Sequence, residues 1–206
     1  MPVDYFQKLK EDIRYKDGMN ACLSCGICTS VCPSAEFSEY DPRKLMLILQ
    51  ENDNVQMESL LGSEYIWYCG QCMSCKTRCP RENTPGMVVQ ALRRVSQETG
   101  LFANSRRGRQ QIRIKRTVGH NLLKHGFCVH PKMVSPEEHP EQGPVWQWVW
   151  DNLEEVFGRL SSNIYKEGPG AARKVDDESL QELNNIFEVT GSKRLFDLIE
   201  YYVPEE

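Results

Sequence analysis

Two short cysteine-rich runs constrain this chain more than any other feature. The first, CLSCGICTSVCP, spans residues 22–33, and the second, CGQCMSCKTRCP, spans residues 69–80. Both follow the pattern C-x-x-C-x-x-C-x-x-x-C-P, and together they hold eight of the nine cysteines. Corresponding cysteines lie 47 residues apart, from Cys22 to Cys69 and from Cys32 to Cys79. The region therefore looks like an internal duplication that forms two pseudo-symmetric halves of one domain.

A second proline and the signals of a helix follow each run. After the first run, Asp41 can cap a helix whose first turn contains Pro42. After the second run, Thr84 is placed to cap and Pro85 to begin a helix that Gly100 can end. No alternation of apolar and polar residues long enough to indicate a strand occurs here. We expect a mainly α fold.

The remainder of the chain divides by composition. Residues 104–126 are basic and predicted to be partly helical, although Gly108 and Gly119 weaken that interpretation. A Pro- and Gly-rich stretch follows and reads as a linker, and helices are expected after it, including 177–189 and 192–202. The predicted organisation is an N-terminal extension (1–17), a helical domain that holds both cysteine runs (18–126), a linker (127–144) and an acidic helical C-terminal extension (145–206).

Composition limits the compartment and the partners. The chain is 40% hydrophobic and 26% charged with a net charge of −4, a balance that does not indicate a nucleic-acid partner. The first 20 residues contain no apolar run of the kind found in secretory signals, and no stretch approaches the roughly 18 apolar residues of a transmembrane helix. These features predict a cytoplasmic protein. In that compartment clustered cysteines are more often metal ligands than disulfides.

Charge is distributed unevenly along the chain. Residues 93–116 hold eight basic residues and one acidic residue, whereas residues 137–206 hold 16 acidic and 6 basic ones. The two segments are candidate docking surfaces, as is the tryptophan-rich stretch with Trp146, Trp148 and Trp150. The alternatives are solvated helix faces for the charges and intrachain packing for the tryptophans.

The spacing of the cysteines favours iron–sulfur clusters. A [4Fe–4S] cluster takes four thiolates, and the C-x2-C-x2-C-x3-C-P run of bacterial two-cluster ferredoxins supplies three of them, while its fourth cysteine ligates the other cluster. Small neighbours such as Gly26 and Gly70 leave room, and Pro33 and Pro80 turn the chain away. The pattern predicts two [4Fe–4S] clusters, with ligands Cys22, Cys25, Cys28 and Cys79 for the first and Cys69, Cys72, Cys75 and Cys32 for the second.

Two zinc sites with four cysteines each are the competing interpretation. Such sites favour two separated C-x-x-C pairs and need no third cysteine at the same short interval. The doubled run with all its spacings and both prolines favours iron–sulfur clusters instead.

Nothing outside the two runs indicates a separate active site. Two complete clusters use all eight thiolates and leave no open coordination position, which suits one-electron transfer. The sequence has no dinucleotide-binding glycine fingerprint and no P-loop lysine, and its four histidines have no persuasive metal-ligand spacing. The ninth cysteine, Cys128, is expected to pack as a small hydrophobe between Phe127 and Val129.

The second run and the residues after it resemble the C subunit of heterodisulfide reductase and its relatives. This stretch reads YCGQCMSCKTRCPRENTPGMVVQALRR. A CPR sequence, then a proline, then a helix ending in Arg-Arg is typical of that group. The resemblance covers about residues 18–116 and implies the helical ferredoxin domain, which also occurs in iron–sulfur subunits of succinate dehydrogenase and glycolate oxidase.

The resemblance also implies a function. In that family, the C subunit passes electrons between the A subunit, which carries flavin and iron–sulfur clusters, and the catalytic B subunit, which handles disulfides. The long acidic tail favours the version found in sulfur metabolism over the methanogen enzyme. The expected function is therefore an electron-transfer subunit of a heterodisulfide-reductase-like complex. The alternative is the iron–sulfur subunit of a flavin-dependent dehydrogenase of the glycolate, glycerol-phosphate or succinate type.

Overall fold

The computed structural model describes residues 3–128, 131–162, 167–171 and 173–203. Helices joined by turns make up the described chain, and no β-strand occurs in it. The helical fold expected from the sequence is thus confirmed. Two compact units are present: the first comprises Met1–Gln110 with Asp197–Glu206, and the second comprises Gln111–Phe196. The domain boundaries expected from the sequence remain predictions.

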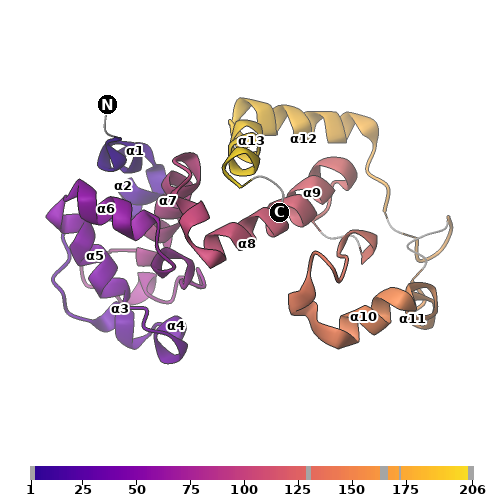
Figure 1. The fold of residues 1–206 in the computed structure, drawn as a ribbon, viewed down its shortest axis with the longest axis horizontal. Coiled ribbons are helices and arrows are strands. Elements are labelled where there is room, and N and C mark those ends of the chain that lie inside the picture. Colours follow the sequence, from indigo (N-terminus) through magenta and orange to yellow (C-terminus); the bar gives the residue numbers. More distant parts are fainter. Residues whose placement is uncertain (1–2, 129–130, 163–166, 172, 204–206) are drawn as a thin grey trace. The chain divides into compact units, whose positions relative to one another are not determined.

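The first unit contains both cysteine runs. Its central element is α7 (Pro85–Glu98), which contacts α1, α2, α5 and α6 (Figure 1). The other helices of this unit are short, and several 3-10 turns connect them. In chain order the helices before α7 are α1 (Tyr5–Glu11), α2 (Ile13–Gly18), α3 (Ile27–Ser30), α4 (Pro33–Phe37), α5 (Pro42–Glu51) and α6 (Asn54–Leu61), followed by the 3-10 turns η1 (Tyr65–Trp67) and η2 (Lys76–Arg78).

Helix α5 begins and ends as its sequence predicts. The Asp41 carboxylate accepts hydrogen bonds from the backbone N–H groups of Arg43 and Lys44, and Pro42 occupies the first turn. Asn52 ends the helix in the left-handed conformation. Leu45 and Leu49 on its inner face are almost fully buried in the core of the first unit. This packing fixes the helix that lies next to the first cysteine run.

Helix α7 begins at the predicted residue, but without a side-chain capping bond. Pro85 lies in the first turn as expected, whereas the Thr84 side chain makes no capping hydrogen bond. Its backbone N–H instead donates to the carbonyl of Gly18 at 2.8 Å. Thr84 is still the N-cap residue of α7, because its carbonyl accepts from the N–H groups of Met87 and Val88, but its side chain makes no capping bond and its own N–H joins the helix start to Gly18. Gly100, at a φ of 78°, follows the helix end as predicted.

The basic stretch is more helical than its two glycines suggested. Helix α8 (Arg106–Ile114) runs through Gly108, the π-helical turn η4 (Lys115–Gly119) ends at Gly119, and α9 (His120–His125) follows directly. A Cβ atom at Gly108 would come within 2.2 Å of the Phe102 carbonyl oxygen. The glycine therefore permits close packing of the helix start against the preceding turn, which outweighs its low helix propensity.

The second unit consists of short helices. The tryptophan-rich stretch with Trp146, Trp148 and Trp150 lies in α10 (Gly143–Asp151), and α11 (Leu153–Arg159) follows after Asn152. Helix α12 (Asp177–Val189) follows, and then α13 (Ser192–Tyr202), of which only the part up to Phe196 belongs to this unit; both lie where helices were expected. Within this unit, buried His139 contacts the Thr117 hydroxyl through Nε2 and Glu141 through Nδ1, which ties the loop before α10 to η4.

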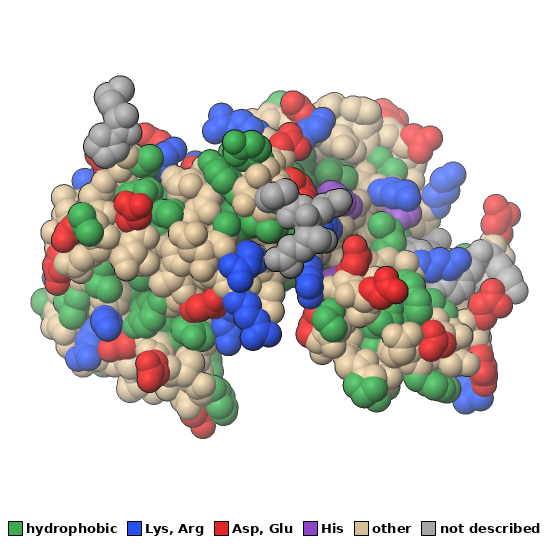
Figure 2. Space-filling view, viewed as in Figure 1, with side chains coloured by type: hydrophobic (Ala, Val, Ile, Leu, Met, Phe, Trp, Pro, Cys, Tyr) green, Lys and Arg blue, Asp and Glu red, His purple; other side chains and the backbone are tan. Residues whose placement is uncertain are grey.

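No helix in the described ranges is both long and apolar enough to cross a bilayer. On the face of the first unit seen in Figure 2, acidic, basic and apolar side chains are interspersed.

Asp12 joins three helices of the first unit. Its backbone N–H closes the end of α1, and its carboxylate accepts from the backbone N–H of Arg14 at the start of α2. The same carboxylate pairs with Arg14 at 2.6 Å and with Arg94 of α7 at 3.2 Å, while its side chain is only 2% exposed. The Arg14 hydrogen bond is the main reason why the pKa of Asp12 falls from 3.8 to about 2.

We predict that Asp12→Asn lowers the free energy of unfolding by about 2 kcal/mol at pH 7. A carboxylate with a lowered pKa stabilises the fold above its unfolded pKa of 3.8, and that contribution is lost only as the pH falls towards 2. The difference between variant and wild type, measured by urea denaturation, should therefore be equal at pH 7 and pH 5. The exposed Asp17 of α2 supplies the control, since Asp17→Asn should change stability little. A gap that narrows between pH 7 and pH 5 would contradict this role.

Candidate metal centre

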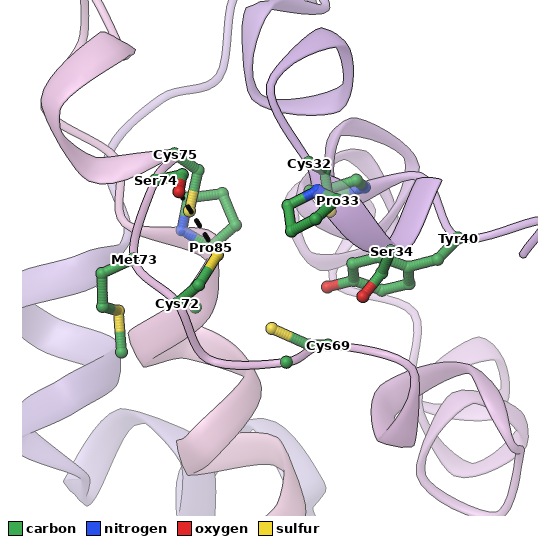
Figure 3. A pocket seen from close by; sticks show the side chains of 13 residues that line it. Cys32, Pro33, Ser34, Tyr40, Cys69, Cys72, Met73, Ser74, Cys75 and Pro85 are labelled. Atoms are coloured by element: carbon green, nitrogen blue, oxygen red, sulfur yellow. Dashed lines mark hydrogen bonds between the residues drawn. The ribbon is translucent and has the colours of Figure 1, made fainter. Parts of the chain in front are cut away.

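Two cavities in the first unit are lined by the eight cysteines of the runs. The space between their walls, including the solvent at their mouths, is about 380 Å³ for one and about 340 Å³ for the other. Each cavity combines three cysteines of one run with the fourth cysteine of the other. The larger is lined by Cys22, Cys25, Cys28 and Cys79, and the smaller by Cys69, Cys72, Cys75 and Cys32 (Figure 3).

Left-handed backbone turns wrap each run around its cavity. Ser24 and Gly26 in the first run have φ angles of 56° and 79°, and Gln71 and Met73 in the second have 54° and 60°. These positions correspond across the 47-residue repeat. Three of the four are not glycine, and for such residues this backbone conformation costs free energy and usually persists only where the surroundings require it. In both runs the turns lie between cysteines that line the same cavity.

The same turns direct backbone N–H groups towards sulfur. The N–H of Ser24 lies 3.4 Å from Cys22 Sγ, and the N–H of Gln71 lies 3.4 Å from Cys69 Sγ. Successive N–H groups in such turns form concave sites for anions, including iron–sulfur clusters. Both runs therefore offer the donors that a thiolate-ligated cluster needs.

Hydrogen bonds between the two halves hold the fourth cysteine in place at each cavity. Near the larger cavity, the N–H of Asn20 donates to Asn83 Oδ1 at 2.6 Å, just before Cys22 and just after Cys79. Near the smaller one, the Ser34 hydroxyl donates to the Tyr68 carbonyl at 2.7 Å. In both cases a residue that precedes one run is bonded to a residue that follows the other. The two runs are thereby crossed.

Arg93 of α7 holds the backbone before the second run. Its Nε donates to the Ile66 carbonyl at 2.9 Å and its Nη2 to the Cys69 carbonyl at 2.7 Å. The guanidinium also stacks over the Trp67 ring, 5.1 Å from its centroid. Sequence reasoning assigned Arg93 to a basic docking segment, but its side chain is half-buried and bound inside the first unit. No local motif could reveal this, because the partners lie 24 and 27 residues away.

Three polar groups at the cavities lack hydrogen-bond partners in the described chain. Tyr40 Oη lines the smaller cavity, and Arg43 Nε and Asn83 Nδ2 belong to residues that line the larger one. A buried donor without an acceptor is costly, so native proteins rarely leave one unless another group is bound there. The cavities thus combine four thiols with free donors, which fits an anionic thiolate-ligated cluster. Sequence reasoning missed all three residues.

The thiols differ in their surroundings. Burial raises the pKa of Cys28 to about 11. Burial also raises the pKa of Cys75. A hydrogen bond from the N–H of Gly86, in the first turn of α7, partly offsets this rise. A hydrogen bond with Ser74 lowers the pKa of the exposed Cys72. Because metal ligation requires thiolates, loading of these sites must release protons.

The arrangement is not that of a single-ion site. Within the described ranges no three His, Cys, Asp or Glu side chains converge closely enough to hold one metal ion. A closed zinc site with four thiolate ligands needs that convergence. The sulfurs instead surround cavities, as a larger group with several metal atoms requires.

Cys128 lies outside both cavities and is exposed. The expectation that it packs as a small hydrophobe is wrong, because it follows the left-handed Gly126 that ends α9 and lies in a surface bend. Its expected neighbour Val129 lies outside the described residues. Among the tryptophans, Trp148 is 54% exposed, whereas Trp146 donates to the Val134 carbonyl at 2.8 Å.

Comparison with known proteins agrees with this geometry. Residues 17–83 match the 4Fe-4S dicluster domain family. The C subunit of the ferredoxin:CoB-CoM heterodisulfide reductase of Methanosarcina acetivorans is 43% identical over 153 residues, which are 73% of this chain and 58% of that protein. An iron–sulfur C subunit of the CoB–CoM heterodisulfide reductase of Methanocaldococcus jannaschii is 33% identical over 72% of this chain and 74% of that protein. The chain belongs to the heterodisulfide reductase C-subunit family.

Membership confirms the predicted cofactors, two [4Fe–4S] clusters, and the role of an electron-transfer iron–sulfur subunit. Both relatives are named as C subunits of heterodisulfide reductases. The chain spans only 58% of the Methanosarcina relative's length, although it spans 74% of the Methanocaldococcus relative. The Methanosarcina relative is therefore longer than this chain. The length of this chain is thus no reason to place it apart from the methanogen enzymes.

We predict that Arg93→Gln lowers the free energy of unfolding by about 2–4 kcal/mol, because two hydrogen bonds from a charged donor to buried carbonyls are lost. The substitution should also release Cys69 from its position and lower the iron content. Anaerobic urea denaturation and iron analysis check both effects. Gln97→Ala, on the same helix, is the control and should leave both values near wild type. Wild-type stability in Arg93→Gln would contradict the assigned role.

Proposed function

We propose that the two clusters are bound by crossed ligand sets, each with three cysteines of one run and the last cysteine of the other. Cys22, Cys25, Cys28 and Cys79 would hold the first, and Cys69, Cys72, Cys75 and Cys32 the second. The single observation that best supports this assignment is the lining of the two cavities, which divides the eight thiols in the same way. The hydrogen bonds between the halves support it independently.

We propose further that the chain relays electrons one at a time. A [4Fe–4S] cluster supplies one-electron transfer when bound. The residues of the chain hold each cluster in position and determine how closely a partner can approach it. The sets use every thiol of both runs as a ligand, so no cysteine of the runs is left to act as a nucleophile. Cys25 and Cys72 lie at the surface, which brings one edge of each site close to solvent and to a docked partner. No active site of its own is proposed for this chain.

The electron acceptor that best fits the family is a disulfide on a catalytic partner. Reduction of a disulfide to two thiols takes two electrons and two protons. A one-electron relay must therefore act twice for each disulfide, and the protons must enter at the catalytic subunit. We propose that the partners are the A subunit, a flavin and iron–sulfur protein that donates electrons, and the disulfide-handling B subunit, which accepts them.

The names of the relatives support a disulfide rather than a carbon substrate. Both relatives described above are named as CoB-CoM heterodisulfide reductase subunits, and one name includes ferredoxin. The long acidic tail was the reason to favour a complex of sulfur metabolism, but it does not distinguish the two versions, given the length of the Methanosarcina relative. We therefore propose heterodisulfide reduction as the reaction served.

Affinity isolation of the tagged chain from its native cells under anoxic conditions tests the proposal. We expect a flavoprotein with iron–sulfur clusters and a cysteine-rich subunit to co-purify. The clusters are first reduced chemically, which lowers their visible absorbance. Addition of a heterodisulfide should then reoxidise them and restore the absorbance, but only when the cysteine-rich subunit is present. Recovery with a 2-hydroxy-acid or glycerol-phosphate dehydrogenase flavoprotein instead would support the alternative function and overturn this one.

Cys128→Ser is the matched control for cluster content. The variant loses a thiol outside both runs, so it should keep about eight iron and about eight sulfide per chain and the same partners. Cys72→Ser, which removes a thiol from one run, should lose close to half of both.

A further inference from the structure

Tyr40 is a buried residue between α4 and α5 that faces the smaller cavity. It is 2% exposed, and its ring packs against Tyr65 with a centroid separation of 5.2 Å. Tyr65 is fixed in turn, because its hydroxyl donates to the Asp41 carbonyl and accepts from the Asp41 N–H, both at 2.8 Å. The Tyr40 ring is therefore held in one place at the cavity wall.

The Tyr40 hydroxyl has a donor to offer but no ordinary acceptor. Its oxygen is inaccessible to water and makes no hydrogen bond of standard geometry in the described chain. Leaving such a group unpaired is costly, because its hydration is lost and nothing replaces it. Burial raises the pKa of Tyr40 most, and the neighbouring thiol of Cys69 raises it further. Figure 3 places Tyr40 and Cys69 on adjoining parts of the cavity wall.

Cys69 is held from its other side by Arg93. The guanidinium binds the Cys69 carbonyl at 2.7 Å, which fixes the backbone of Cys69 but leaves its sulfur free to face the cavity. A thiolate at this position accepts hydrogen bonds far better than a neutral thiol, because hydrogen bonds to ionised groups are shorter and stronger. Ligation to a metal converts the thiol to that form. The phenol is thus matched to an acceptor that becomes stronger when the site is loaded.

The corresponding position at the other cavity has no such group. The helices that follow the two runs begin at Pro42 and Pro85, 43 residues apart, so the residue that corresponds to Tyr40 is Asn83, which has no hydroxyl. The larger cavity instead has the unpaired donors of Asn83 and Arg43. The duplication is therefore symmetric in its cysteines and asymmetric in the donors that surround them. Any effect of Tyr40 should be confined to one of the two sites.

We propose that Tyr40 is a positioning residue that donates a hydrogen bond from its hydroxyl to Cys69 Sγ in the loaded site and thereby raises the reduction potential of that cluster alone. The inference rests on the proposed assignment of Cys69 to the smaller cavity. Its sign follows from charge: the reduced site is one unit more negative than the oxidised site, so a donor to its sulfur stabilises the reduced form more. Hydrogen bonds to sulfur are among the features that set such potentials.

Tyr40→Phe removes the donor and keeps the ring. We expect the ratio of reduced to oxidised cluster at a fixed potential to fall about tenfold, which is about 59 mV for a one-electron couple. An EPR-monitored redox titration of the purified holoprotein should show one midpoint lowered by this amount and the other unchanged. The signal lost in Cys72→Ser identifies the cluster of the second run. Tyr65→Phe is the matched control, because it loosens the same ring pair without removing the donor at Cys69.

A second measurement does not depend on the size of the shift. Deuterium ENDOR of the reduced wild-type protein in D2O should detect exchangeable deuterons coupled to the second-run cluster, and Tyr40→Phe should lose the coupling of the Tyr40 hydroxyl while it keeps that of the Gln71 N–H. An unchanged ENDOR spectrum in Tyr40→Phe would overturn the inference, as would equal shifts of both midpoints or the same shift in Tyr65→Phe. These outcomes leave the proposed relay intact, since both clusters would still be assembled. Failure of the relay would appear instead as loss of partner-dependent oxidation in wild type.

Discussion

The crossing of the two cysteine runs is the constraint on which the first unit depends. Each run supplies three thiols to one cavity, but the fourth thiol there is the last cysteine of the other run. These two last cysteines, Cys32 and Cys79, lie 47 residues apart. Neither run alone therefore lines a cavity with four thiols. Hydrogen bonds such as Asn20 to Asn83 and Ser34 to Tyr68 join the halves at both cavities. Helix α7 then packs behind this arrangement, with Arg93 bound to the carbonyl of Cys69.

The sequence predicted the helices and the cofactor well because both depend on local patterns. The cap at Asp41 and the start at Pro85 follow from residues within one turn, and cysteine spacing alone indicated cubane clusters. It could not predict the inner wall of the cavities. Tyr40 and Arg93 reach the second run only through the tertiary fold, and so does the bond from the Thr84 N–H to the Gly18 carbonyl.

The two sites are equivalent in their thiols but not in their environment. The left-handed turns recur at corresponding positions, with Gly26 in the first run and Met73 in the second. The donors around them differ, with Tyr40 at one cavity and Asn83 and Arg43 at the other. A duplicated scaffold thus gives two sites of the same composition and unequal surroundings. Unequal surroundings allow unequal potentials, which give a relay its direction.

The measurement that tests crossed ligation most directly is EPR of Cys79→Ser, read against Cys28→Ser and Cys32→Ser. Crossed ligation predicts that Cys79→Ser alters the same signal as Cys28→Ser, although Cys79 lies in the second run. Cys32→Ser should alter the other signal. If Cys79→Ser instead changed the signal lost in Cys72→Ser, each run would hold its own cluster, and the crossed arrangement would be wrong.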